Sequence, residues 1–180
     1  MIKVHHVAIA FSLCFLLASC SKNENDLQPV TQTHEVVNPA VRSYTGFPET
    51  FESGTKTSYT TANVTLTSGS WNFNNALIGT SSSDRKNGSK SVRIQNTGNL
   101  TMNFNVTGGA SSVSVAYARY GSDASSTFGL WYSTNSGSTW TQTGSTITVS
   151  ATTLNTASFS LSLTGNARFQ LRKQIGRAHV

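Results

Sequence analysis

Histidine, cysteine and acidic side chains perform most enzyme chemistry, and this chain has few of them in its central part. The four histidines are His5, His6, His34 and His179. Both cysteines lie in the first 20 residues. Between residues 47 and 173 the acids are Glu49, Glu52, Asp84 and Asp123. A Ser–His–Asp triad, a histidine base or a His/Cys metal site cannot be built from such a segment. We therefore expect no catalytic residues and no enzyme activity in the chain as given.

Arginine and aromatic side chains are the remaining groups that could recognise a ligand. The chain carries a net charge of +6. Guanidinium groups bind phosphate or anionic sugars, and aromatic rings stack on bases or sugars. The candidate ligand-binding residues are Arg93, Arg119, Arg168, Arg172, Tyr120 and Trp131. The alternatives are that the basic residues only aid solubility, and that Trp131, if buried, is core on the second face of its strand.

Short alternating runs of apolar residues position these side chains. From Phe47 onward the runs have a period of two, which is typical of half-buried strands in antiparallel sheets. The paired apolar positions include Trp71/Phe73, Val92/Ile94, Val113/Val115, Phe128/Leu130 and Phe159/Leu161. Clusters rich in Asn, Gly and Ser separate the runs, among them Asn-Thr-Gly at 96–98. A connection that contains residues 76–78 is expected to close one end of the core. We predict an all-β, antiparallel two-sheet β-sandwich of jelly-roll type over residues 47–173, similar to carbohydrate-binding and galactose-binding modules.

The first 20 residues have the features of an export signal. Lys3 provides a positive charge, and an apolar stretch from Val7 to Leu17 is too short to span a bilayer. The sequence Leu-Ala-Ser-Cys at its end resembles the lipobox of bacterial lipoproteins. That resemblance implies that Cys20 is lipidated and anchors the protein to a membrane. The alternative is a plain secretory signal. Residues 21–46 are polar and predict a disordered tether, similar to those of outer-membrane or cell-surface lipoproteins of Gram-negative bacteria.

The segments "ETFESGTK", "SGSW" and "SSDRKNGSK" resemble the N-terminal module of secreted bacterial lipoproteins in which a non-specific DNA/RNA endonuclease domain follows. The likeness extends over residues 47–173 and includes no catalytic motif. It implies a non-catalytic accessory module whose downstream enzyme, a metal-dependent endonuclease, is missing from this chain. In some such modules an acid near the start helps to hold a structural calcium ion, for which Glu49 and Glu52 are the candidates. The alternative is that both acids lie on a solvated edge strand.

The last residues, "QIGRAHV" at 174–180, continue neither the alternation nor any turn pattern. One coding sequence for them resembles a widely used short-read sequencing adapter that continues into a stop codon. We predict that residues 174–180 are not native and that the sandwich lacks its last strand, which would leave an unpaired sheet edge.

These observations favour a non-catalytic binding module of an exported lipoprotein that serves a nuclease. Nucleic acid or a glycan is the expected ligand. The alternatives are a carbohydrate-binding module of a surface glycan-handling lipoprotein and a structural or adhesive surface domain.

Overall fold

The computed structural model describes residues 2–8 and 44–174, and within these ranges the only regular elements are β-strands. The strands are β1 (Ile2–Ala8), β2 (Ala62–Leu66), β3 (Gly69–Gly79), β4 (Ser91–Met102), β5 (Ala110–Arg119), β6 (Ser126–Ser133), β7 (Thr141–Val149), β8 (Asn155–Leu163) and β9 (Arg168–Gln174). None of the described residues belongs to a helix long and apolar enough to cross a membrane. Cys20, nearly all of the predicted tether and residues 175–180 lie outside the described ranges.

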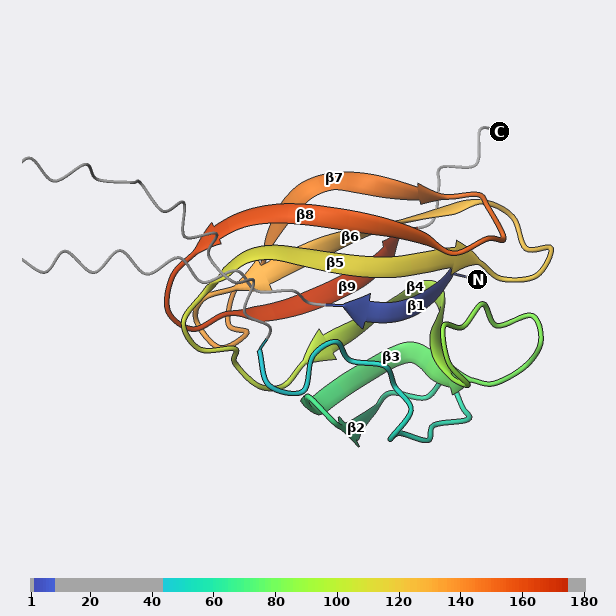
Figure 1. The fold of residues 1–180 in the computed structure, drawn as a ribbon, viewed down its shortest axis with the longest axis horizontal. Coiled ribbons are helices and arrows are strands. Elements are labelled where there is room, and N and C mark those ends of the chain that lie inside the picture. The colour runs from blue at the N-terminus through green and yellow to red at the C-terminus, as the bar shows by residue number, and fades with distance from the viewer. Residues whose placement is uncertain (1, 9–43, 175–180) are drawn as a thin grey trace, which may run out of the picture.

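The strands form one antiparallel network that folds over at β4 into two layers (Figure 1). The order is β7-β6-β9-β4-β1-β5-β8, and β3 pairs with the other side of β4 while β2 pairs with β3. The N-terminal half of β4 pairs with β1, and its C-terminal half pairs with β9. The layers face each other, because Phe128 of β6 contacts Tyr117 of β5 and Phe159 of β8, with ring centroids 5.2 and 6.5 Å apart. The predicted all-β antiparallel sandwich is confirmed.

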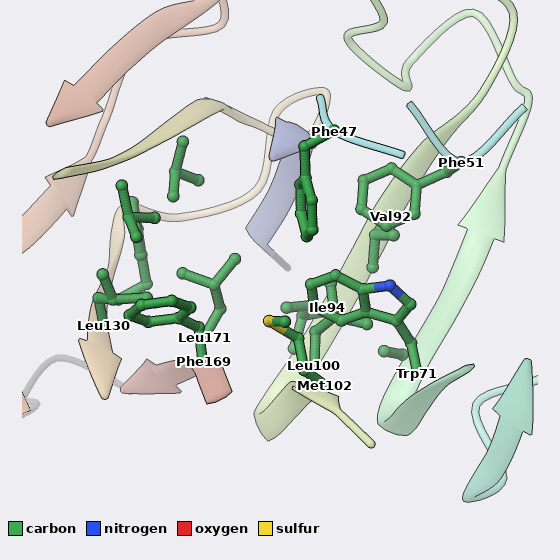
Figure 2. Close-up of a cluster of buried hydrophobic side chains, with 14 of the residues drawn as sticks. Phe47, Phe51, Trp71, Val92, Ile94, Leu100, Met102, Leu130, Phe169 and Leu171 are labelled. Atoms are coloured by element: carbon green, nitrogen blue, oxygen red, sulfur yellow. The ribbon is translucent and has the colours of Figure 1, made fainter. Parts of the chain in front are cut away.

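The core between the layers consists of the apolar residues that the alternation predicts to point inward. Figure 2 shows Trp71, Phe47 and Phe51 converging on one side of this core and Leu130, Phe169 and Leu171 on the other. Trp71, Phe73, Val92, Ile94, Val113, Val115, Phe128 and Leu130 are all buried, as expected. Burying such side chains contributes about 1.5–3 kcal/mol each before chain entropy is subtracted.

Two segments predicted as connections are parts of long strands. Asn-Thr-Gly at 96–98 lies inside β4, and residues 76–78 lie inside β3, although they are buried as expected. The β3–β4 register shifts between Asn74 and Ala76, and Asn75 and Asn96 both have a φ of 48°. Asparagine tolerates this left-handed conformation, so the strands bulge and bend instead of ending. This bend lets one hairpin extend along both layers.

Residues 2–8 form a strand that the sequence does not predict. β1 lies between β4 and β5 and is antiparallel to both. β9 lies inside the network, between β4 and β6. In the described chain the facing edges of β4 and β5 are therefore paired with β1 instead of open. The export signal predicted for residues 1–20 stays a prediction.

The ordered body begins before Phe47, the predicted start. The Tyr44 ring contacts the ring of Phe47 edge-on at 6.0 Å, and its hydroxyl donates to the carbonyl of Asn105 at 3.3 Å. The last three residues of the predicted tether, 44–46, are consequently part of the folded structure.

Candidate functional site

β9 divides its side chains between the core and the outer surface of its layer. Phe169, Leu171 and Lys173 are buried, and the alternate residues Arg168, Gln170 and Arg172 are half-buried and point the other way. The neighbouring strand β6 is paired so that Gly129 lies opposite Arg172 and Trp131 opposite Gln170. The structure thus brings three of the six candidate binding residues, Trp131, Arg168 and Arg172, onto one surface. We call the outward side chains of Trp131, Arg168, Gln170, Arg172 and Thr101 the β9 face.

A stacked pair lies at the centre of the β9 face. The Arg172 guanidinium lies over the Trp131 ring, 4.6 Å from its centroid. The ring in turn lies over Gly129, where an added Cβ would come within 2.8 Å of it. Gln170 accepts a hydrogen bond from Nε of Arg172. Trp131 is only 9% exposed, so it belongs to the outer face of the layer but is covered. The Trp131 ring is therefore not open for stacking on a base or a sugar. The Arg172 guanidinium is the group that a ligand would meet.

Burial lowers the pKa of Arg172 below its usual value. An arginine nevertheless stays protonated at neutral pH, because its ordinary pKa exceeds 12. The stack on Trp131 and the hydrogen bond to Gln170 restrict its rotamers before any ligand arrives. Arg172 is consequently a preorganised cation.

A row of neutral hydrogen-bonding side chains continues the β9 face across the layer. The register aligns Asn63, Asn72, Thr101, Gln170, Trp131 and Gln142 on six neighbouring strands. At a strand spacing of about 4.8 Å this row is about 24 Å long. Nδ2 of Asn72 donates to Asn63 at 2.8 Å, and Nε2 of Gln170 donates to Thr101 at 2.6 Å. Sequence reasoning missed the polar members of this row. Their outward positions were readable from the alternation, but their alignment across strands was not.

Arg168 lies at the other end of the β9 face. Its Nε donates to the Asn105 side chain at 2.6 Å. Arg168 and Arg172 are four residues apart on one strand, and hence about 13 Å apart along it. Asn105 is a neutral acceptor, so it leaves the charge of Arg168 uncompensated.

Arg93 and Tyr120 form a separate cluster. Arg93 is placed 4.2 Å from the centroid of the Tyr120 ring and forms a 2.7 Å ion pair with Asp84. Burial tends to lower the pKa of Arg93, but hydrogen bonds and charges from Asp84 and Tyr59 outweigh it and raise that pKa. Asp84 also accepts from the backbone and hydroxyl of Ser81, at 2.8 and 2.7 Å. The charge of Arg93 is thus used to hold the 81–84 turn against β4.

Arg119 lies away from both groups. In the register of the sheet, Arg119 of β5 and Ile94 of β4 both lie opposite Ile2 of β1. Arg93 of β4 lies opposite Lys3, which is the next residue of β1. Neighbouring positions along a strand point to opposite faces. The register therefore places Arg119 on the other face of the layer from Arg93, and the six candidates do not form one site.

Glu49 and Glu52 are each held by hydrogen-bond donors. Glu49 is fully buried instead of lying on a solvated strand, and Phe51, whose φ is 63°, turns its N–H back onto it at 2.7 Å. The N–H and hydroxyl of Ser68 donate to the other oxygen at 2.9 and 2.7 Å. Glu52 accepts from the N–H groups of Ser89 and Lys90, at 2.9 and 3.0 Å. Both oxygens of each carboxylate therefore already accept hydrogen bonds from separate sets of donors, and the structural calcium ion stays a prediction. No group of three or more His, Cys, Asp or Glu in the described ranges could hold a metal.

The four acids of the body all lie away from the β9 face. Glu49 accepts a hydrogen bond from Ser68, and Glu52 accepts one from Ser89. Asp84 is ion-paired with Arg93, and Asp123 lines a cavity together with Lys173. The β9 face consequently combines two arginines with neutral polar groups and is locally positive.

The chain was compared with protein-family models, with curated proteins and with solved structures. None of the three comparisons finds a match. Among the described residues, the β9 face offers the most chemistry for recognition.

Proposed function

We propose that this protein is a non-catalytic module of an exported lipoprotein that binds nucleic acid through the β9 face. The observation that carries the proposal is the Arg172 guanidinium stacked on Trp131 at 4.6 Å, with Arg168 uncompensated on the same strand. Phosphate oxygens accept from guanidinium N–H groups in a planar geometry. Two fixed cations about 13 Å apart suit an extended polyanion better than a single small anion.

The neutral row beside the arginines would contribute contacts that do not depend on charge. The amides of Asn72 and Gln170 and the hydroxyl of Thr101 can donate to or accept from sugar and base groups. These contacts carry no readout of a particular base order, because they come from one flat surface and not from a groove-inserted element. Binding without sequence preference matches an accessory role beside a non-specific nuclease.

The anchor and the partner enzyme complete the proposal. Cys20 would be lipidated and would hold the module on the outer membrane or cell surface, with residues 21–43 as the spacer. The module would keep nucleic acid close to a downstream endonuclease domain. That enzyme would be effective at lower substrate concentration because the substrate is retained near it.

The test is binding of fluorescent single-stranded DNA by the recombinant chain, measured by anisotropy at two salt concentrations. Two phosphate contacts give a slope of about −1.4 in log K against log salt, so a fourfold rise in salt weakens binding about sevenfold. Arg172→Gln and Arg168→Gln should each weaken binding and reduce the slope by about 0.7. Arg85→Gln is the matched control, because it removes the same charge from the loop between β3 and β4, away from the β9 face, and should leave binding unchanged.

Equal losses from all three variants would show that only net charge matters and would overturn the β9 face as the site. Absence of DNA binding at low salt would overturn nucleic acid as the ligand.

A neutral glycan is the second candidate, and the row of Asn, Thr and Gln side chains on five of the six aligned strands is the observation that favours it. Glycan binding would be insensitive to salt and would be lost in Trp131→Ala, because that change removes the support of Arg172. A glycan panel measured at the same two salt concentrations separates this candidate from the first.

A further inference from the structure

The position of β1 between β4 and β5 is a slot for one extended strand. On one side Ile2, Lys3 and Val4 pair with Ile94, Arg93 and Val92. On the other side β1 pairs with β5 from Arg119 to Ser114. Two strand spacings separate β4 from β5, about 10 Å, which leaves room for a single strand and not for a helix. In Figure 1 β1, drawn in blue, lies beside β5.

An empty slot would be costly because it lies inside the network and not at its edge. Without β1, backbone N–H and C=O groups of β4 and β5 would face each other unpaired. Core residues beside the slot, among them Val92 and Val115, are fully buried and would be reached by water. The domain therefore requires an occupant.

Residues 2–8 are not available to an exported, processed protein if the predicted signal is removed before Cys20. The slot must then be filled by another segment. This inference rests on that prediction and on the prediction that residues 174–180 are not native. It does not depend on which ligand the β9 face binds.

The topology indicates where the replacement strand comes from. β9 and β1 lie one after the other on the same side of β4, β9 opposite residues 99–101 and β1 opposite 92–94. Both are antiparallel to β4, so the C-terminal end of β9 leads toward the start of the slot. A cavity of about 290 Å³ lies at this junction, lined in part by Gln95, Asn96 and Lys173. A connection from β9 into the slot would pass there.

We propose that the β4–β5 slot is a strand-acceptor site, and that in the exported protein it is filled in cis by the native segment that follows β9. That segment is extended and carries apolar residues at the two positions opposite Ile94 and Val92. Continuing the β9–β4 register beyond the Asn99–Arg172 pair assigns positions 177 and 179 to Ile94 and Val92. These positions hold Arg177 and His179, so the sequence of residues 175–180 does not meet this requirement. Ile2 and Val4 do, at the same two register positions.

The first part of the test disrupts β1 in the full chain, produced without export so that residues 2–8 are retained. Val4→Asp places a charge opposite Val92 and Tyr117 and should lower Tm by about 10 °C. Hydrogen exchange should show lost amide protection in residues 92–94 and 114–119. Lys3→Ser, at the register position opposite Arg93, is the matched control and should shift Tm by less than about 2 °C.

The second part restores a strand after β9. In the Val4→Asp chain, residues 175–180 are replaced by a Gly/Ser linker of about four residues and a copy of Ile2–Ala8. This chain should be monomeric and should regain both Tm and amide protection, even if Val4→Asp alone does not fold. The matched control carries the Val→Asp change in the added copy too and should not recover.

Three results would overturn the proposal. Unchanged protection in Val4→Asp would mean that no strand is needed in the slot. Failure of the added strand to restore protection would exclude filling from the end of β9. Recovery of Val4→Asp through a stable dimer, measured by sedimentation, would assign the slot to a second copy of the chain instead.

Discussion

Glu49 is a fully buried carboxylate whose replacement tests how the start of the domain is held together. One oxygen accepts from the Phe51 N–H at 2.7 Å, and the other accepts from the N–H and hydroxyl of Ser68 at 2.9 and 2.7 Å. The Ser68 hydroxyl also accepts from Nε1 of Trp71 at 2.9 Å. One carboxylate thus connects a turn, the β2–β3 connection and the largest core side chain.

Glu49→Gln keeps the shape but replaces one acceptor oxygen with an NH₂ donor. In its better orientation the amide oxygen faces Ser68 and the NH₂ faces the N–H of Phe51, so two donors meet in a buried site. The loss of one charge-assisted hydrogen bond costs about 1.5–3 kcal/mol, and the unsatisfied Phe51 N–H adds about 1 kcal/mol or more. We expect a destabilisation of about 3–4 kcal/mol, a large share of the 5–15 kcal/mol typical of a domain.

Urea unfolding followed by tryptophan fluorescence measures this change, because Trp71 lies next to the site. The midpoint should fall while the m-value stays constant. Glu52→Gln is the matched control. Glu52 also accepts two backbone N–H groups but is only half-buried, and its replacement should cost less than about 1 kcal/mol. Ser68→Ala should cost about 1–2 kcal/mol and combine non-additively with Glu49→Gln.

Two results would refute this reasoning. If Glu49→Gln costs no more than Glu52→Gln, the buried hydrogen bonds do not stabilise the fold as described. If EDTA lowers the unfolding midpoint of the unchanged protein and removes the difference between it and Glu49→Gln, Glu49 is a calcium ligand and the predicted ion is present.

Two further substitutions test the bend in β4 and the stack on β6. Asn96→Val should destabilise the protein by about 1–2 kcal/mol in urea unfolding, because a β-branched residue is strained at a φ of 48°, whereas Asn96→Gly should be nearly neutral in the same measurement. Gly129→Ala brings a methyl group within 2.8 Å of the Trp131 ring, so it should displace the ring, release Arg172 and weaken DNA binding as much as Arg172→Gln does. Unchanged binding in a folded Gly129→Ala protein would contradict the role given to the stack.

The individual strands and their inward faces were predictable, because the alternation of apolar and polar residues is visible within each short segment of the sequence. Trp71, Phe73, Phe128 and Leu130 are buried as their spacing predicts. Asn-Thr-Gly at 96–98 was predicted as a turn, but it is a bulge inside β4. The same residues favour both structures, and the long β3 partner selects the bulge. The strand at residues 2–8 was not predictable from its composition, because what stabilises it is a slot built from β4 and β5.

By itself, the sequence determined that the body is an antiparallel β-sandwich and that its basic and aromatic residues are the groups available for recognition. Only the tertiary structure decided which of them meet. Trp131, Arg168 and Arg172 share a surface, whereas Arg93 is paired with Asp84 and Arg119 lies elsewhere. The tertiary structure also showed that Glu49 is buried among donors. The physical reason is that alternation places a side chain on a face of its own strand, while contacts across strands depend on register and bulges set by residues far away in the chain.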